Sequence, residues 1–291
     1  MRTIKEAAGR SRRLRAKGCS IALVPTMGFF HEGHLELMRK GRSLAEDLVV
    51  SLFVNPTQFG PNEDFAEYPR NTEQDLVRAE EEGVDAVFLP DAEQMYPEGF
   101  QTFIDQEHLP QHLCGLSRPG HFRGVLTVVA KLFHIISPDI AVFGEKDFQQ
   151  LAIIRQMVRD LNFGIEIHAV PTVRESDGLA MSSRNARLAP AEWQAALSLY
   201  QSLQAARDLV EQGETRTEQI IAAAEAVISK HPEAAIDYIT INDPQTLVEI
   251  DRLEQPALLA LAVRIGEVRL IDHTLLDPAL CGKRYPGFAK P

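Results

Sequence analysis

The chain has 291 residues, enough for one large or two ordinary domains, and its 45% hydrophobic and 24% charged residues are typical of a soluble globular protein. Its net charge of −11 argues against broad nucleic-acid binding, and no run approaches the roughly 20 apolar residues of a membrane span. Three widely separated cysteines argue against a disulfide framework and a structural zinc site, and the basic N-terminus lacks a signal-peptide core. We therefore expect a cytoplasmic protein with neither nucleic-acid nor membrane partners.

Short apolar runs alternate with helical patterns through the first half of the chain. We expect strands at residues 20–25, 48–54, 85–90, 139–144 and 165–171, and helices at 35–47, 72–82, 124–136 and 147–161. This alternation predicts an α/β fold, a doubly wound, Rossmann-like parallel sheet with helices on both faces. Ligands of such a sheet bind at the carboxyl ends of the strands.

The pattern changes after residue 171. The polar, irregular stretch at 172–188 is followed by expected helices at 190–212 and 215–230 and by expected strands at 235–243, 256–266 and 268–276. Gly266 and Glu267 could turn the last two strands into a hairpin. The sequence thus predicts a Rossmann-like domain over residues 1–172 and a smaller α+β domain over residues 173–291.

The stretch VPTMGFFHEGH (24–34) follows the first expected strand and opens the next helix. A helix N-terminus presents unpaired N–H groups to an anion, and Gly28 and Gly33 let a ligand approach the backbone. His31 and His34, three residues apart, could aim donors at the same phosphates; the alternative is a capping His31 and an ordinary surface His34. No dinucleotide-binding, P-loop or HExxH motif is present.

Two further stretches offer polar side chains. In NPTQ (55–58), Asn55 and Gln58 could hold a carboxylate or hydroxyl without adding charge, or could simply form a turn. RPGHFRG (118–124) places Arg118, His121 and Arg123 before an apolar helix, where they could bind an anion or compensate acidic neighbours.

The last two stretches add cations. In FGEKDFQQ (143–150), Lys146 lies at a carboxyl strand end, and either Gln149 or Gln150 could face a pocket. AMSSRNARL (180–188) has no apolar period and could be a mobile phosphate clamp or a flexible linker. Because these loops should gather at one sheet edge, their convergent cations imply a polyanionic ligand.

The motifs PTMGFFHEGH, NPTQFGPNEDFAEYPR, LCGLSRPGHFRGVLTVVAKLF, FGEKDFQQ and MSSRN, in this order, resemble the pantothenate synthetase (pantoate–β-alanine ligase) family, strongly over residues 20–190 and more loosely to about residue 280. HEGH is similar to the HIGH element of a wider nucleotidyltransferase superfamily. The family usually has a small residue and Leu where this chain has Phe29 and Phe30. That departure alters packing beside the ATP site and not the chemistry.

The resemblance implies that pantoate and ATP form pantoyl adenylate and pyrophosphate, after which the β-alanine amine displaces AMP. It implies an ATP site made of Met27, Gly28, His31, Gly33, His34, Gly144, Glu145, Lys146, Asp147, Val173, Met181, Ser182, Ser183 and Arg184. Gln58 and Gln150 would hold pantoate, and Asn55, Arg118 and His121 would complete the pantoate and β-alanine site. His34 takes the proton donor's position, and His34, Lys146 and Arg184 are the expected catalytic residues.

The resemblance also implies Mg²⁺, a homodimer, and a C-terminal domain that acts as a lid. Asp75 is our candidate magnesium ligand; the alternative is a solvent-facing aspartate on a helix. Two other functions stay open at this point. One is a nucleotidyltransferase acting on a phosphorylated acceptor, against which Gln58, Gln150 and RPGHF argue. The other is an ATP-sensing module without turnover, against which the retained Lys146 argues.

Overall fold

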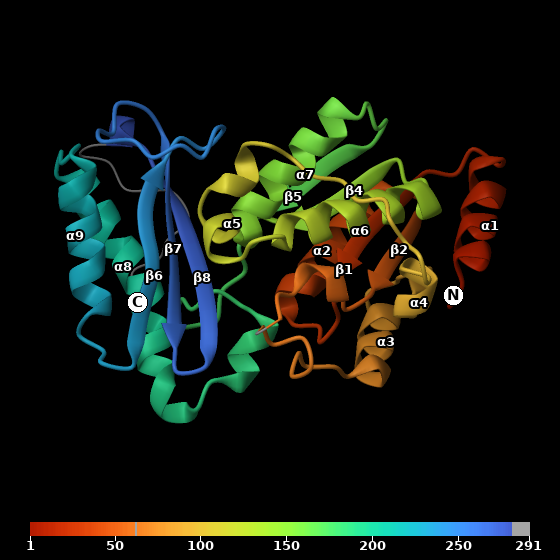
Figure 1. Ribbon diagram of the computed structural model, residues 1–291, viewed down its shortest axis with the longest axis horizontal. Coiled ribbons are helices and arrows are strands. Elements are labelled where there is room, and N and C mark those ends of the chain that lie inside the picture. Colours follow the sequence, from red (N-terminus) through yellow and green to blue (C-terminus); the bar gives the residue numbers. More distant parts are fainter. Residues whose placement is uncertain (62, 281–291) are drawn as a thin grey trace. The chain divides into compact units, whose positions relative to one another are not determined.

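The computed structural model describes residues 1–61 and 63–280, which divide into two compact units (Figure 1). The first unit consists of residues within 1–110 and 118–173, and the second consists of residues 111–117 and 174–280. The short segment 111–117, which lies inside the predicted first domain, therefore groups with the second unit. The end of the predicted second domain, residues 281–291, lies outside the described residues.

The first unit alternates strands and helices, as the apolar pattern predicts. Its strands are β1 (Ile21–Thr26), β2 (Asp47–Leu52), β3 (Ala86–Phe88), β4 (Ile140–Gly144) and β5 (Glu166–Val170). Its helices are α1 (Ile4–Arg15), α2 (Glu32–Leu44), α3 (Thr72–Glu81), α4 (Ala92–Met95), α6 (His121–Ile136) and α7 (Phe148–Asp160).

The five strands form one parallel sheet in the order β3-β2-β1-β4-β5. The chain leaves β1 toward β2 on one side, and β4 pairs with β1 on the other, so the strand order reverses at β1. A doubly wound sheet opens a crevice for ligands at this point, outside the carboxyl ends of the strands. The predicted fold class is confirmed.

Helices cover both faces of this sheet. Side chains of α2 and α3 pack with alternate sheet residues such as Val24 and Val50, while α6 contacts α1, α7 and β1. Intervening sheet residues such as Leu23 are also fully buried. The strands read as continuous apolar runs for this reason. The basic N-terminal segment forms α1, and its Arg10 pairs with the buried carboxylate of Asp47 at 2.5 and 2.6 Å.

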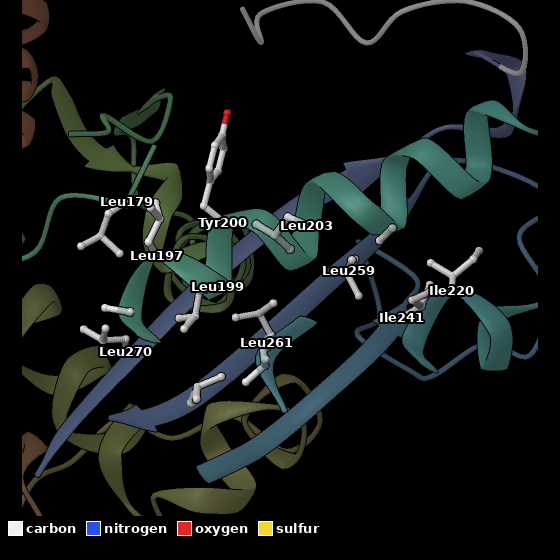
Figure 2. Close-up of a cluster of buried hydrophobic side chains, with 14 of the residues drawn as sticks. Leu179, Leu197, Leu199, Tyr200, Leu203, Ile220, Ile241, Leu259, Leu261 and Leu270 are labelled. Atoms are coloured by element: carbon white, nitrogen blue, oxygen red, sulfur yellow. The ribbon is translucent and has the colours of Figure 1, made fainter. Parts of the chain in front are cut away.

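The second unit is an antiparallel sheet with two long helices. Strands β6 (Ala234–Asn242), β7 (Ala257–Ile265) and β8 (Val268–Leu276) pair in that order, and Gly266 and Glu267 turn the predicted hairpin between β7 and β8. Helices α8 (Trp193–Glu211) and α9 (Thr217–Ile228) pack on this sheet, and the short α5 (Cys114–Ser117) joins the same unit. Figure 2 shows leucine and isoleucine side chains of α8, α9 and the sheet filling the core between them. Along the described chain, no helix is both long enough and apolar enough to cross a membrane.

Candidate functional site

The predicted site segments of the first unit follow three neighbouring strands. The turn at residues 27–31 follows β1, Asn55–Gln58 follows β2, and Glu145–Asp147 follows β4. Because these strands are parallel and adjacent, their carboxyl ends lie at one edge of the sheet. The structure therefore brings together three of the five stretches that we predicted to converge.

The β1–α2 turn is held in an unusual backbone conformation. Gly28 and Phe29 both have positive φ, 88° and 54°. The carboxylate of Asp75 on α3 accepts hydrogen bonds from the Phe29 and Phe30 N–H groups at 2.8 and 2.7 Å. A Cβ on Gly28 would lie only 2.9 Å from that carboxylate, so a glycine is needed here. Arg78, one turn along α3, donates to the Phe30 carbonyl.

These contacts give Asp75 a place that the sequence did not indicate. Its side chain is only 2% exposed, so the alternative of a solvent-facing aspartate is wrong. Both carboxylate oxygens already accept backbone hydrogen bonds, which gives the side chain a structural purpose without a metal. Its part in magnesium binding stays a prediction. Among the residues that the structure describes, no three His, Cys, Asp or Glu side chains gather as a metal site.

His31 and His34 lie together at the start of α2. The His31 N–H donates to Nδ1 of His34 at 3.3 Å, and the two ring centroids are 4.1 Å apart. Gly33 makes room for this arrangement, because a Cβ there would lie 2.9 Å from the His31 ring and 3.8 Å from Val173. The expected residues His31, Gly33, His34 and Val173 thus share one corner of the first unit.

Both histidines are neutral at pH 7. Burial, followed by the nearby charge of Lys146, lowers the pKa of His31 to about 4. Burial also holds the pKa of His34 well below its usual value, with smaller contributions from His31 and Lys146. Because Nδ1 of neutral His34 accepts a hydrogen bond, its proton lies on Nε2, which can donate to an anion. Nδ1 of His31 is buried without a hydrogen-bond partner among the described residues.

Lys146 supplies the positive charge of this corner. It lies in a 3-10 turn, Glu145–Asp147, that follows Gly144 at the end of β4, rather than in the first turn of a helix. Its side chain is 21% exposed, and its ammonium lies 3.8 Å from the Asp147 carboxylate. A partly exposed ammonium beside two neutral imidazoles can attract a phosphate. The influence of Lys146 on both histidines shows that the three groups are close.

A cluster of neutral polar side chains follows β2. Asn55, 1% exposed, donates from Nδ2 to Gln58 Oε1 and to the Gly124 carbonyl, both at 3.1 Å. Its Oδ1 accepts from the Thr57 hydroxyl at 2.9 Å and from the Tyr96 hydroxyl at 2.8 Å. We call Asn55, Thr57, Gln58 and Tyr96 the amide cluster. Asn55 is fully engaged in it, so its contacts are those of a residue that orients Gln58.

The side-chain amide of Gln58 reaches across to the end of β1. Its Nε2 donates to the Met27 sulfur at 3.1 Å, and its side chain is buried. A thioether is a weak acceptor, so this amide can exchange it for a carboxylate or hydroxyl of a ligand. Gln58 therefore combines a fixed orientation with an available donor.

Arg118 and His121 bond to protein groups beside this cluster. Arg118 forms a two-point ion pair with Glu63 at 2.8 and 2.5 Å, and His121 Nδ1 donates to the Gln58 carbonyl at 2.8 Å. Burial, then the charge of Arg118, lowers the pKa of His121 to about 4. Arg123 stacks on Phe103, with 3.9 Å between its guanidinium carbon and the ring centroid. The assignment of Arg118 and His121 to a substrate stays a prediction.

On α7 the two glutamines differ. Gln149 is buried and donates from Nε2 to the Leu109 carbonyl at 2.9 Å, whereas the neighbouring Gln150 is half-buried. The position of Gln150 is compatible with the predicted contact to a ligand, which stays a prediction.

The MSSRN segment belongs to the second unit, whereas the contacts described above lie in the first unit. Its contact with a nucleotide therefore stays a prediction. Where the sequence suggests an irregular loop, Ser183–Arg187 forms a 3-10 helix. The Ser182 hydroxyl accepts from the Arg184 N–H at 3.2 Å, and Asn185 donates to the Ala180 carbonyl at 3.1 Å. Such local side-chain bonds order a short helix that has no hydrophobic period. Met181 immediately precedes it.

Sequence reasoning missed four residues of the site. Tyr96, Glu63, Gly124 and Arg78 hold the segments that carry the predicted ligand contacts. A Cβ on Gly124 would lie 2.3 Å from the Thr57 carbonyl oxygen. The separations in sequence explain why they were missed: Tyr96 lies 41 residues from Asn55, and Glu63 lies 55 from Arg118.

Comparison with known proteins identifies the relatives of this chain. The family model described as pantoate-beta-alanine ligase matches residues 1–275. A pantothenate synthetase of Desulfatibacillum aliphaticivorans is 56% identical over 271 residues, covering 93% of this chain and 96% of the relative. One of Geobacter sulfurreducens is 56% identical over 266 residues, covering 91% and 94%.

Two solved structures are similar along nearly the whole chain. The pantothenate synthetase of Thermus thermophilus has a TM-score of 0.90 and 44% identity, covering 94% of this chain and 98% of that one. The pantoate-beta-alanine ligase of Francisella tularensis, complexed with beta-gamma ATP and beta-alanine, has a TM-score of 0.79 and 35% identity, covering 94% and 96%.

Proposed function

Because the chain belongs to the pantoate–β-alanine ligase family, we propose that its site forms pantothenate from pantoate, β-alanine and ATP through a pantoyl adenylate. Condensation of the two acids is the reaction of this family, and the chain is an enzyme of that kind. What we add is the assignment of the steps to its own residues. The observation that carries the assignment is the meeting of His31, His34 and Lys146 at the switch point of the sheet.

In the first step a pantoate carboxylate oxygen attacks the α-phosphorus of ATP, and pyrophosphate leaves. In the second step the β-alanine amine attacks the acyl carbon, and AMP leaves with that oxygen while the amine loses its proton. The first step must bring together two anions, which repel by roughly 4 kcal/mol per unit charge pair at about 4 Å and an effective dielectric near 20. Positive and donor groups fixed in advance offset this repulsion.

We assign the phosphates to the corner formed by the β1–α2 turn and Lys146. The Lys146 ammonium attracts phosphate charge, and Nε2–H of neutral His34 donates a hydrogen bond to it. The N-terminal N–H groups of α2 add further donors. The remaining residues proposed for ATP are Met27, Gly28, His31, Gly33, Gly144, Glu145, Asp147, Val173, Met181, Ser182, Ser183 and Arg184.

Pantoate is assigned to the amide cluster. Within the part of the chain that the structure describes, Gln58 Nε2 donates only to the weak acceptor Met27 Sδ, so a pantoate oxygen can take that sulfur's place. Gln150 on α7 is the proposed second contact. Neutral amides suit this role, because they fix an anion in place without weakening its carboxylate as a nucleophile.

Magnesium is proposed as a partner of ATP. Mg²⁺ commonly keeps several waters and binds phosphate oxygens with one or two carboxylates. Asp75 is the ligand proposed from the sequence, and the carboxylate of Asp147 beside Lys146 is a further candidate. The ion would neutralise phosphate charge. Every other contribution described here comes from the chain itself.

The rest of the proposal concerns assembly. Residues 173–291 would act as a smaller lid domain that brings Met181–Arg184 to the nucleotide and shields the adenylate from water. We also propose a homodimer in the cytoplasm.

Pantoate-dependent exchange of labelled pyrophosphate into ATP, measured without β-alanine, tests the proposed first step. We expect exchange that needs pantoate and stops when pantoate is left out. Folded protein that makes pantothenate but shows no such exchange would refute the adenylate route. Exchange that runs with a phosphorylated acceptor in place of pantoate would refute the substrate.

A further inference from the structure

Arg118 is nearly saturated by protein contacts. An arginine has five N–H donors. Nε and Nη2 bond to the Glu63 carboxylate at 2.8 and 2.5 Å, Nη2 bonds to the Gln58 carbonyl at 3.2 Å, and Nη1 bonds to His121 Nε2 at 3.1 Å. An anionic substrate would have to compete with a carboxylate that is already held in the two-point geometry that arginine binds best.

Both ring nitrogens of His121 are likewise bonded to protein groups. Its Nδ1 lies 2.8 Å from the Gln58 carbonyl, which can only accept, so the ring proton lies on Nδ1. Its Nε2 is then free of hydrogen and accepts from Arg118 at 3.1 Å. The depressed pKa of His121, about 4, keeps this neutral form across the physiological range. Both ring nitrogens therefore serve one internal arrangement.

The two side chains meet on one atom, the backbone carbonyl oxygen of Gln58. That carbonyl belongs to the 3-10 turn Pro56–Gln58, which carries the pantoate contact assigned above. Helix α6, which carries His121, also packs its backbone directly against the turn, because a Cβ on Gly124 would lie 2.7 Å from the Gln58 Cα. The turn is thus fixed by hydrogen bonds from Arg118 and His121 and by close packing against the backbone of α6 at Gly124.

We propose that Glu63, Arg118 and His121 are positioning residues, which fix the Gln58 turn for pantoate, and that Arg118 does not bind a substrate carboxylate. This inference rests on the proposed function. Glu63 aligns the guanidinium, the guanidinium and the Gln58 carbonyl both require the His121 proton on Nδ1, and Arg118 and His121 together hold that carbonyl. Pantoate then meets the neutral amide of Gln58 and not a free cation.

Glu63→Gln separates positioning from direct binding, because the two predict changes of opposite sign. If Arg118 bound pantoate, loss of the competing carboxylate would free the guanidinium and lower the KM for pantoate. Under our proposal the turn loosens, and the KM for pantoate rises about tenfold while the KM for ATP stays within about twofold. Both constants come from the pyrophosphate exchange assay. A pantoate KM that falls or does not change overturns the proposal, as does an equal rise in both constants.

Asp47→Asn is the matched control, because Asp47 also forms a two-point ion pair with an arginine, Arg10, in the first unit. It should lower the melting temperature without changing either KM. Glu63→Asp keeps the charge and should fall between wild type and Glu63→Gln in the KM for pantoate. If Glu63→Gln does not fold, a Glu63→Asp variant with unchanged KM overturns the proposal.

A second readout is independent of the reaction. Nitrogen-15 NMR of the imidazoles should show His121 protonated on Nδ1 at pH 7 in the wild type and a mixture of tautomers in Glu63→Gln. If the wild type shows no pantoate-dependent exchange but has this tautomer, the proposed function fails and the positioning network stands. An Nε2-protonated His121 in the wild type overturns the network itself.

Discussion

The two halves of the site are built in opposite ways. In the β1–α2 turn and at Lys146, polar groups are left available: His31 Nδ1 has no described partner, and Nε2 of His34 carries the ring proton in its neutral tautomer. In the amide cluster, Asn55 is satisfied on both its oxygen and its nitrogen. The difference suits the ligands proposed for the two halves. Phosphates are bound by charge and many donors, whereas a small hydroxy acid must be oriented, and a rigid, internally bonded turn does this.

Loss of the positive charge of Lys146 should have the largest effect on the reaction. Lys146→Ala should lower the adenylation rate at least about 100-fold, because a preorganised cation is lost at the point where two anions meet. Single-turnover formation of the adenylate measures this rate. Lys17→Ala, which removes an exposed lysine elsewhere in the same unit, is the control and should leave the rate unchanged. A near-normal rate in Lys146→Ala would contradict the assignment of the phosphates to the Lys146 corner.

Displacement of the Pro56–Gln58 turn should have the second-largest effect. A Cβ at Gly124 would lie 2.3 Å from the Thr57 carbonyl oxygen, a backbone atom that must then shift. Gly124→Ala should therefore raise the KM for pantoate about tenfold and lower the free energy of unfolding by about 1–3 kcal/mol. Gly164→Ala is the matched control, because a Cβ there meets no atom within 4 Å. Equal behaviour of the two variants would show that the turn tolerates movement.

The half-buried histidines His31 and His34, whose pKa values are lowered, predict a stability that falls in acid. The unfolded chain protonates His31 near pH 6.5, but the folded chain does so only near pH 4, so stability is lost as the pH falls through this window. Between pH 7 and pH 5 one such histidine accounts for a loss of about 2 kcal/mol. Urea unfolding of His31→Gln should show a correspondingly smaller loss than the wild type. His108→Gln, which changes an exposed histidine, should follow the wild type; if His31→Gln does so too, His31 is not buried as a neutral ring.

Removal of a single hydroxyl group from the amide cluster should have the smallest effect. Tyr96→Phe removes the hydroxyl that donates to Asn55, while the Thr57 hydroxyl still bonds to the same oxygen. We expect a loss of about 1 kcal/mol in the free energy of unfolding and a KM for pantoate within about twofold of wild type. A tenfold rise in that KM would show that the cluster orients Gln58 through Tyr96 more than through Asn55.

The sequence predicts the parallel sheet well because buried strands and amphipathic helices each leave a periodic apolar signal. It also predicts that the loops after β1, β2 and β4 converge, since topology alone brings those strand ends together. The partners of individual side chains, in contrast, cannot be predicted from the sequence. The Asp75 carboxylate bonds to a turn 45 and 46 residues away, and no local pattern distinguishes it from an exposed helical aspartate.

The arginine of RPGHF illustrates the same limit. Its charge suggests an anion site, and only the structure shows that Glu63, 55 residues away, already occupies the guanidinium. The 3-10 helix at Ser183–Arg187 was missed for another reason, because it is held by local side-chain bonds and leaves no hydrophobic period.

The central claim is that the pantoate carboxylate attacks the α-phosphorus of ATP, and isotope transfer tests it most directly. Pantoate labelled with oxygen-18 in its carboxylate is turned over with ATP and β-alanine, and the products are analysed by mass spectrometry. The account predicts one labelled oxygen in AMP and none in pyrophosphate. Unlabelled AMP, or label in pyrophosphate or inorganic phosphate, would contradict it.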